Sequence, residues 1–317
     1  MIVTDTTNLL TSLKQQQQTL SGDAKSASAV AWQWCDADEN SQNLYVKIEH
    51  PAIIKHVTWH SKGDYFATTM PDCGSASVYV HQFSKCKSQA PFSKSKGIVQ
   101  RVLFHSTQPL FFVASQRHIR VYNLVQQQLT KKLIANCRYI SSLALHHSGD
   151  HVLAGSYDCR INWFDMDLSV KPYQTLRYHK EAVRAVAFHK RYPLFASASD
   201  DGSVIISHGK TYSDFSNPMI VPVKVLRGHS KTAAGLSITD CVFHPSQPWI
   251  FTAGADGDIR LFNESSSELG SSSKSEMPLA IFAAHQQNDD IQRMGNDFPA
   301  FVVTTEKMEI QSRKKVE

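Results

Sequence analysis

The stretch ITDCVFHPSQPWIFTAGADGDIRLFN, residues 238–263, decides the fold of this chain. It contains three apolar runs separated by two short turns, at 245–248 and 255–257. Runs rich in β-branched and aromatic residues, bounded by Gly, Pro and Asp, are typical of strands joined by tight turns. Because such neighbours pair antiparallel, the stretch predicts three strands of an antiparallel meander.

The same pattern occurs four more times upstream, and each copy is anchored on one histidine. The upstream copies begin IIKHVTWH (53–60), IVQRVLFH (98–105), YISSLALH (139–146) and AVRAVAFH (182–189), so the anchors are His60, His105, His146, His189 and His244. Their spacings are 45, 41, 43 and 55 residues. A period of roughly 40 to 45 residues is typical of a four-stranded propeller blade, and the long last interval requires an insertion. We therefore expect an all-β propeller with about five complete four-stranded blades.

The first strand of each repeat is apolar on both of its faces. Six residues before each anchor stands a β-branched residue: Ile54, Val99, Ile140, Val183 and Ile238. The residues between the apolar positions are themselves small or apolar, which predicts a strand covered on both sides. Sheets stacked radially around an axis provide this cover and protect most of their own edges.

These repeats resemble WD repeats, although the Trp-Asp dipeptide has become Tyr122-Asn123, Phe164-Asp165 and Phe262-Asn263. In WD repeats a His, a Ser and a tight-turn Asp form a buried network that fixes each blade. The resemblance places that network at His50, His179, His229, Asp158, Asp201 and Asp256. A buried, satisfied His-Asp pair needs no catalysis to explain it, so we expect a structural role. The second repeat departs from the pattern, with Ser95 and Gln116 at these positions.

Four longer stretches are more specific than the strand pattern. They are HQFSKCKSQAPFSKSKGIVQRVLFH (81–105), FDMDLSVKPYQTLRYH (164–179), RYPLFASASDDGSVIISHGKTY (191–212) and DCVFHPSQPWIFTAGADGDIRLF (240–262). They closely resemble the C-terminal propeller of the block-of-proliferation family of ribosome-biogenesis proteins, and the resemblance extends from about residue 30 to residue 262.

The resemblance implies a non-catalytic scaffold of the nucleolus and nucleoplasm that supports pre-rRNA processing to 5.8S and large-subunit rRNA. It also implies three partners: pescadillo, a second WD-repeat protein that bears a ubiquitin-like domain, and the pre-rRNA or preribosome. WD repeats by themselves also fit a generic adaptor, for example a substrate receptor of a ubiquitin ligase. Co-purification with pescadillo and large-subunit pre-rRNA would separate the two functions.

The chain departs from the family at both ends. The family propeller has seven blades, whereas five full repeats and strand-like pieces at 30–34 and 44–48 occur here. We therefore expect an incomplete seven-bladed ring over residues 29–263, preceded at 1–28 by a partial blade or disordered segment. Residues 264–317 begin with a Ser-rich stretch and resemble nothing in the family, which predicts a divergent, disordered tail outside the propeller.

Composition and motifs predict neither an enzyme nor a membrane protein. The sequence lacks the G-x-S-x-G, P-loop, dinucleotide-binding and H-E-x-x-H patterns, so we expect no catalytic residue, small-molecule substrate or cofactor. It has no run of 18 apolar residues. Its six cysteines are scattered, and His146-His147 has no further ligand at metal spacing, so no metal site is expected. The net charge is +5, but residues 1–263 carry 27 Lys or Arg against 19 Asp or Glu, and this net of +8 is compatible with an anionic partner such as RNA or with a solvated basic surface.

Two segments are candidates for contacts with RNA or a protein partner. The first is the linker with Lys85, Lys87, Lys94, Lys96 and Arg101, whose cations could straddle phosphates while Phe92 anchors the segment or stacks on a base. A merely solvated loop is an equally good interpretation. The second is the insertion at 217–236, where Pro218 and Pro222 preclude a central strand and Arg227 and Lys231 would lie on a loop. A structural crossover is the simpler reading there.

Overall fold

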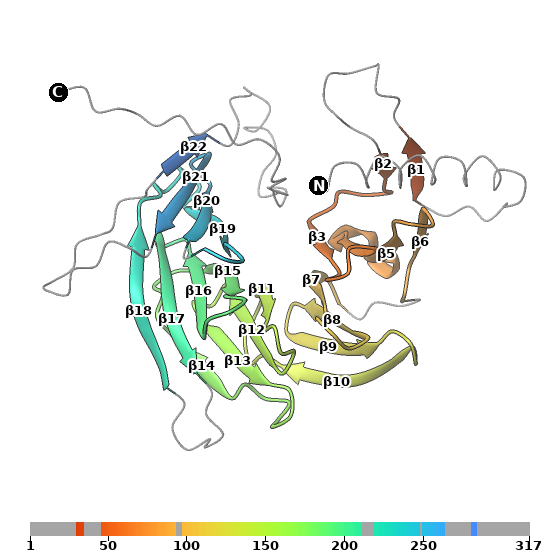
Figure 1. Cartoon of the computed structure of the whole chain (residues 1–317), viewed down its shortest axis with the longest axis horizontal. Helices are drawn as coiled ribbons and strands as arrows, with labels where there is room; N and C mark the ends of the chain where they lie inside the picture. The colour runs from red at the N-terminus through yellow and green to blue at the C-terminus, as the bar shows by residue number, and fades with distance from the viewer. Residues whose placement is uncertain are drawn as a thin grey trace, which may run out of the picture.

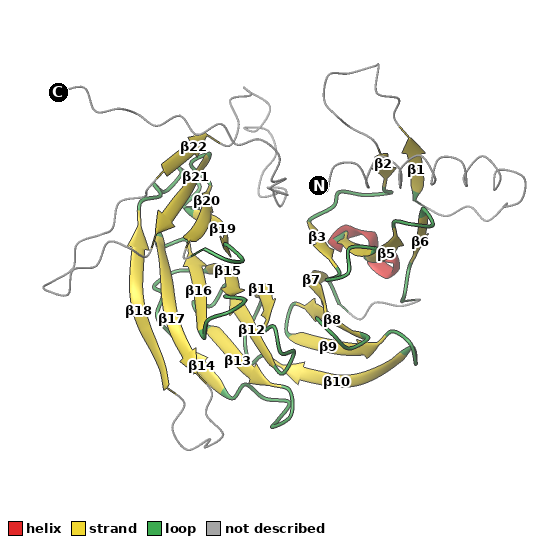
Figure 2. Cartoon of the chain, in the orientation of Figure 1, coloured by secondary structure: helices red, strands yellow, loops and turns green. Residues whose placement is uncertain are grey.

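In a computed structural model, the chain forms five four-stranded antiparallel sheets that follow one another in an arc (Figure 1). The structure describes residues 30–34, 46–92, 97–210, 219–247, 249–263 and 280–283. Strands dominate these ranges, and Pro71–Ala76, a short 3-10 helix, is their one helical segment (Figure 2). No helix within them has the length and apolar character needed to cross a bilayer. The predicted all-β propeller is confirmed.

Each sheet is a meander whose strands follow sequence order from the inside of the arc outward. The first sheet consists of β3 (His56–Trp59), β4 (Tyr65–Thr69), β5 (Val78–Gln82) and β6 (Lys87–Gln89), and the second of β7 (Val99–Phe104), β8 (Leu110–Ser115), β9 (His118–Asn123) and β10 (Gln128–Ile134). The third contains β11 (Ile140–Leu145), β12 (His151–Ser156), β13 (Ile161–Asp165) and β14 (Gln174–Leu176). The fourth contains β15 (Val183–Phe188), β16 (Leu194–Ser199), β17 (Ser203–Lys210) and β18 (Met219–Arg227), and the fifth β19 (Ile238–Phe243), β20 (Trp249–Gly254), β21 (Asp258–Asn263) and β22 (Ala280–Ala283).

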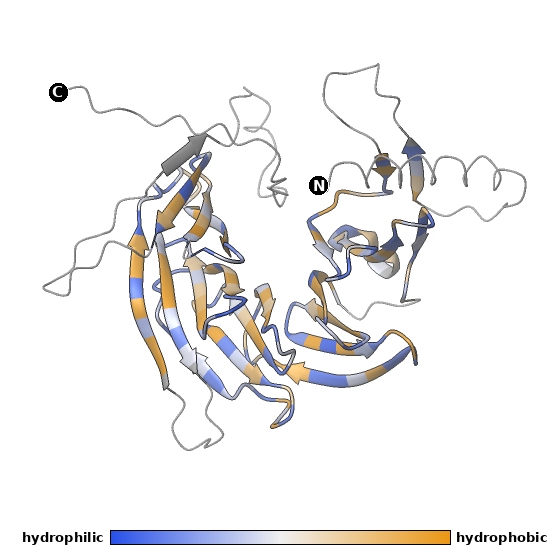
Figure 3. Ribbon diagram, in the orientation of Figure 1, coloured by the Kyte–Doolittle hydropathy of each residue, from blue (hydrophilic) through white to orange (hydrophobic). Residues whose placement is uncertain are grey.

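The hydrophobic core is divided among the interfaces between neighbouring blades. The innermost strands β3, β7, β11, β15 and β19 lie side by side in that order, and each blade packs its apolar side chains against the next. At the interface of the fourth and fifth blades, for example, Ala185, Ala196 and Val204 pack against Ile238 and Cys241. Apolar positions, orange in Figure 3, occur along the strands of all five blades. This packing explains why the first strand of each repeat is apolar on both faces.

The five anchor histidines hold the turn that follows each innermost strand. The Nδ1 atom of His105 accepts hydrogen bonds from the backbone N–H groups of Thr107 and Gln108, at 3.1 and 3.0 Å. His60, His146, His189 and His244 accept the equivalent bonds in their own blades. The repeated histidine is thus architectural. In the third blade, Gly149 has φ +92°, and the His105 ring lies where a Cβ atom would stand.

A two-stranded hairpin precedes the first blade, as the strand-like pieces at 30–34 and 44–48 predicted. It consists of β1 (Ala31–Trp34) and β2 (Val46–Glu49), which pair antiparallel. The indole of Trp32 packs edge-on against Phe66 and donates a 2.7 Å hydrogen bond to Ser88 Oγ. The hairpin therefore covers part of the first blade.

The expected end of the propeller at residue 263 was wrong for one segment. Residues Ala280–Ala283 form β22, which pairs with β21 from Leu261↔Ala280 to Asp258↔Ala283 and completes the fifth blade. The physical reason is that an edge strand such as β21 leaves unpaired backbone groups, which the apolar residues 280–283 satisfy. The remainder of 264–317 and the segment 1–28 lie outside the described residues.

The insertion in the last repeat interval is divided between an edge strand and a loop. The nine-residue β18 is the outermost strand of the fourth blade, where Pro222 is tolerated because an edge strand leaves one side of its backbone unpaired. The register with β17 shifts between Ile206 and Ser207, opposite Pro222. Arg227 therefore ends a strand and does not lie on the expected loop, whereas Lys231 does.

Candidate interaction surfaces

The fourth blade contains a buried network of His, Ser and Asp side chains. Nδ1 of His179 lies 3.1 Å from Oδ2 of Asp201, and its Nε2 lies 2.8 Å from the hydroxyl of Ser197. Asp201 also accepts hydrogen bonds from the backbone N–H of Lys180 and Ser203. Burial raises the pKa of Asp201, but the hydrogen bonds from His179 and Ser203 outweigh it and hold that pKa well below its ordinary value. Every polar atom of the pair has a structural partner.

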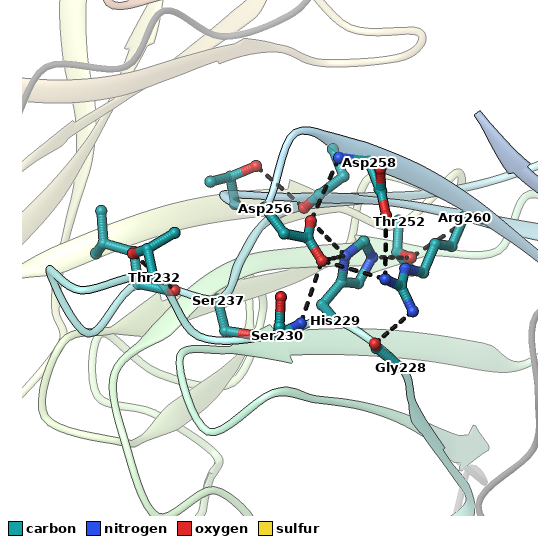
Figure 4. A network of polar contacts seen from close by, with 12 residues as sticks. Gly228, His229, Ser230, Thr232, Ser237, Thr252, Asp256, Asp258 and Arg260 are labelled. Carbon is teal, nitrogen blue, oxygen red and sulfur yellow. Dashed lines mark hydrogen bonds and ion pairs between the residues drawn. The ribbon is translucent and has the colours of Figure 1, made fainter. Parts of the chain in front are cut away.

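The fifth blade repeats this arrangement with threonine in place of serine (Figure 4). Nδ1 of His229 lies 3.0 Å from Oδ1 of Asp256, and Nε2 lies 2.8 Å from the hydroxyl of Thr252. Arg260 adds an ion pair to Asp256 at 3.3 Å. Burial lowers the pKa of His229 despite the carboxylate beside it. The network is intact although His229 itself lies within the insertion at 217–236.

The first and third repeats depart from the predicted network. His50 lies 3.1 Å from Thr68 Oγ1 and 3.3 Å from His81 Nε2, and its described contacts include no carboxylate. Asp158 accepts a 2.7 Å hydrogen bond from the backbone N–H of Arg138. The residue ten before the anchor of that repeat is Asn136, not histidine, so Asp158 holds a loop without a buried partner ring.

The structure brings together only part of the predicted basic linker. Lys85 and Lys87 are exposed on the turn and outer strand of the first blade, whereas Lys94 and Lys96 lie outside the described residues. Arg101 is on the innermost strand β7, and its Nε donates to the backbone oxygen of Ser141 in the third blade. Phe92 packs on Tyr122 with ring centroids 4.5 Å apart, so it anchors the segment to the second blade.

The two cations of the insertion lie at the same end of the fourth blade but face different surroundings. Arg227 is exposed, and its backbone pairs with Ser203 at the end of β18. Lys231 forms an exposed ion pair with Glu181 at 2.5 Å. Exposed pairs of this kind contribute about 0 to 1 kcal/mol, so neither cation is required for the fold.

A cluster of three arginines was missed by the sequence analysis. Arg117, Arg138 and Arg160 line a solvent-open depression of about 720 Å³ between the second and third blades, together with Asp158. Arg117 and Arg160 flank corresponding turns of consecutive blades, and Arg138 is on the linker between them. They are 43 residues apart at most, so no local charge run reveals them. Superposing the turns of successive repeats would have brought them together.

A second depression, with about 540 Å³ of empty space, separates the fourth and fifth blades and has an apolar lining. This depression exists because a large side chain of the third blade is replaced by a smaller one at the equivalent position of the fourth blade. Trp163 of β13 is 1% exposed and fills the space between the third and fourth blades. The corresponding residue of β17 is Ile206, whose smaller side chain leaves a groove bordered by Tyr192 and Val223.

The described residues contain no candidate metal site, because no three His, Cys, Asp or Glu side chains among them lie close enough together to bind one ion. The five anchor histidines hold turns, and His179 and His229 belong to the blade networks. The accessible groups at the ends of the blades are cations, aromatic rings and grooves. Such surfaces are suited to binding another molecule.

Comparison with known proteins agrees with the repeat pattern. The family model described as WD domain, G-beta repeat matches residues 127–165, 170–206 and 220–263. The chain is 57% identical over 234 residues to the ribosome biogenesis protein bop1-B of Xenopus laevis, which covers 74% of this chain and 32% of that protein. It is 54% identical over 232 residues to ribosome biogenesis protein BOP1 of Homo sapiens, covering 72% and 31%. For the BOP1 homolog of Anopheles gambiae the identity is 51% over 263 residues, covering 83% and 30%.

The chain thus spans about a third of the length of these relatives. Identity above 50% over more than 230 residues extends through turns and linkers as well as strands, which a shared fold alone would not require. Across its WD-repeat region, this chain is therefore a homologue of proteins named ribosome biogenesis protein BOP1.

Proposed function

We propose that the chain is a non-catalytic scaffold in the biogenesis of the large ribosomal subunit, acting in the nucleolus and nucleoplasm. The observation that carries this proposal is the 57% identity to a protein named for ribosome biogenesis. A scaffold role also agrees with the use of the polar side chains. The buried His, Ser and Asp groups satisfy one another within the blades, so they fix the shape of the binding surfaces.

The finer part of the proposal concerns what the scaffold holds. Its partners are pescadillo, the WD-repeat protein with a ubiquitin-like domain, and pre-rRNA on its way to 5.8S and large-subunit rRNA. Exposed cations at the blade ends and the apolar groove at Tyr192 and Val223 are surfaces of the kinds that RNA and proteins use.

The basic linker belongs to the same proposal. Lys85 and Lys87 are exposed and lie two residues apart, and Lys94 and Lys96 follow within ten residues. Lysines spaced in this way neutralise phosphates mainly by releasing counterions. Arg101 is excluded from this surface because its side chain is engaged by the third blade.

Co-purification is the test of the scaffold function. The tagged chain, expressed in cells whose own BOP1 protein is depleted, is expected to recover pescadillo together with large-subunit pre-rRNA. A tagged chain with Asp201→Ala, which weakens a blade, is the control for recovery that depends on the fold. Recovery of ubiquitin-ligase subunits without pre-rRNA would instead favour the generic adaptor and would overturn the proposal.

A further inference from the structure

Three loops meet at the depression between the second and third blades, and backbone hydrogen bonds connect them. The N–H of Ala135 donates to the oxygen of Arg117 at 3.3 Å, and the N–H of Ile140 donates to that of Gln116 at 2.8 Å. The N–H of Tyr157 donates to the oxygen of Tyr139 at 3.1 Å. The β8–β9 turn, the linker to β11 and the β12–β13 turn therefore form one framework, and their side chains are presented in a fixed arrangement.

This framework presents a surplus of positive charge. Arg117 and Arg138 are exposed, and their guanidinium groups have no partner among the described residues. Arg160 is half-buried, and its Nη1 donates to the backbone oxygen of Asn136 at 3.3 Å. The one carboxylate that lines the depression is Asp158, which already accepts the backbone N–H of Arg138. Guanidinium groups with free donors are suited to phosphate oxygens.

Two tyrosines belong to the same loops as these arginines: Tyr139 follows Arg138, and the backbone of Tyr157 is bonded to that of Tyr139. Tyr139 is 45% exposed and Tyr157 is 40% exposed, although both belong to tightly bonded loops. The guanidinium carbon of Arg184 lies 4.9 Å from the centroid of the Tyr157 ring, and Asp200 holds Arg184 by a 2.7 Å ion pair. Tyr157 is therefore oriented from one side and remains accessible elsewhere. Exposed aromatic rings with fixed orientation are platforms on which unpaired bases stack.

We propose that Arg117, Arg138 and Arg160, with Tyr139 and Tyr157, form a binding site for single-stranded RNA. The arginines contact the backbone phosphates, and the tyrosines stack against one or two bases. An acidic protein segment would use the same arginines, but it gives no reason for two exposed tyrosines on the same loops. The site deepens the scaffold function proposed above, on which its biological meaning rests, although RNA binding itself can be measured without it.

The first measurement is fluorescence anisotropy of a fluorescein-labelled, mixed-sequence 12-nucleotide RNA titrated with the full chain at low salt. The double variant Arg117→Gln/Arg138→Gln removes two unpartnered cations and should weaken binding about tenfold. The slope of log affinity against log salt should become shallower by about 1.4, since each lost phosphate contact on a single strand accounts for roughly 0.7. Lys190→Gln/Arg191→Gln is the matched control, because it removes two exposed cations from a turn at the opposite end of a blade.

The second measurement isolates the stacking. Tyr139→Ala should weaken binding of the single strand about fivefold or more, the loss expected for one base stack, and Tyr139→Phe should restore it because phenylalanine keeps the ring. Circular dichroism melting of each variant shows that the fold is kept. Equal losses in the two arginine and lysine variants, or no loss from Tyr139→Ala, would overturn the site.

Two further probes separate the site from its alternatives. A 12-base-pair double-stranded RNA should bind more weakly than the single strand, and an acidic 12-residue peptide of Asp and Glu should compete poorly. A peptide that binds as tightly as RNA and is indifferent to Tyr139→Ala would assign the surface to a protein partner and refute the RNA site. A chain that binds RNA through this site but recovers no pre-rRNA from cells would contradict the scaffold function alone.

Discussion

His179 and Asp201 are 3.1 Å apart in the fourth blade, and the side chain of His179 is completely buried. The pair joins the linker before the blade to the turn between its second and third strands, which are 22 residues apart in sequence. Such a contact between distant segments fixes the blade, because neither group can recover its hydrogen bonds from water without unfolding.

The first prediction is that Asp201→Ala lowers the free energy of unfolding by about 1 to 3 kcal/mol, because it leaves the buried imidazole without its partner. Urea denaturation measures this loss. The matched control is Asp158→Ala, the equivalent position of the third repeat. Among the described residues, the Asp158 carboxylate accepts a hydrogen bond only from the backbone N–H of Arg138, so its removal should lower the free energy of unfolding less. Equal costs at both positions would contradict the importance of the buried histidine.

Several parts of this fold can be predicted from the local sequence pattern, whereas others depend on contacts between residues that are far apart in the sequence. The anchor spacing predicted the blades, and the turn residues predicted their meander. The strand at Ala280–Ala283 could not be predicted from the repeat, because a Ser-rich segment precedes it and its partner β21 determines its structure. The same holds for the three-arginine cluster, whose members become neighbours only when consecutive blades stack. Local sequence specifies each blade, whereas neighbouring blades create the surfaces.

The second prediction concerns pH. Burial lowers the pKa of His81 to about 4, with a smaller contribution from His50, and burial likewise lowers that of His146 to about 4. Their unfolded value is near 6.5. Between pH 6.5 and pH 4 these histidines are protonated in the unfolded chain but remain neutral in the folded chain. Proton binding therefore favours the unfolded chain, and the free energy of unfolding decreases as the pH falls from 6.5 towards 4.

Urea midpoints at pH 7.5, 6 and 4.5 measure this decrease. His81→Asn lowers stability at pH 7.5 because it disturbs the Thr68 and Ser88 hydrogen bonds, but its profile should be flatter because one titrating group is gone. Gln126→Ala, at an exposed residue that carries no titrating group, is the control and should keep the wild-type profile. A midpoint that rises on acidification would show that these rings are accessible to protons in the folded chain.

The third prediction concerns the N-terminal hairpin, which is attached to the first blade through Trp32. Its indole N–H donates to Ser88 Oγ at 2.7 Å, and Ser88 also contacts Nδ1 of His81 at 2.8 Å. Trp32→Phe removes the donor but keeps an aromatic ring, so we expect a loss of about 0.5 to 1.5 kcal/mol, the usual contribution of one hydrogen bond.

A double-mutant cycle with Ser88→Ala tests whether that loss belongs to this bond, since the two changes should not be additive. Trp59→Phe is the matched control, because the Trp59 ring is 52% exposed and packs on Phe66. Full additivity of Trp32→Phe and Ser88→Ala would show that the hairpin is not attached to the first blade through this hydrogen bond.

The fourth prediction concerns the end of the arc at the fifth blade. In the fourth blade, Ala187 belongs to a row whose side chains the fifth blade covers. The equivalent residue of the fifth blade is Val242, which lies opposite Phe251, and Phe251 lies opposite Leu261. Val242 is 54% exposed, because no sixth sheet follows among the described residues. An exposed large apolar side chain such as Val242, at the edge of an apolar row, favours association with another surface.

We therefore expect the purified chain to scatter X-rays as an open arc at low concentration and to associate reversibly as its concentration rises. Val242→Lys should weaken this association, because a cation on this face of the blade resists burial. Val125→Lys is the control: Val125 is 77% exposed in the turn after β9, away from the end of the arc, and its replacement should leave association unchanged. Sedimentation velocity of the three proteins measures the effect. A compact monomer whose scattering fits a closed disc, with both variants unchanged, would mean that the first and fifth blades meet in solution.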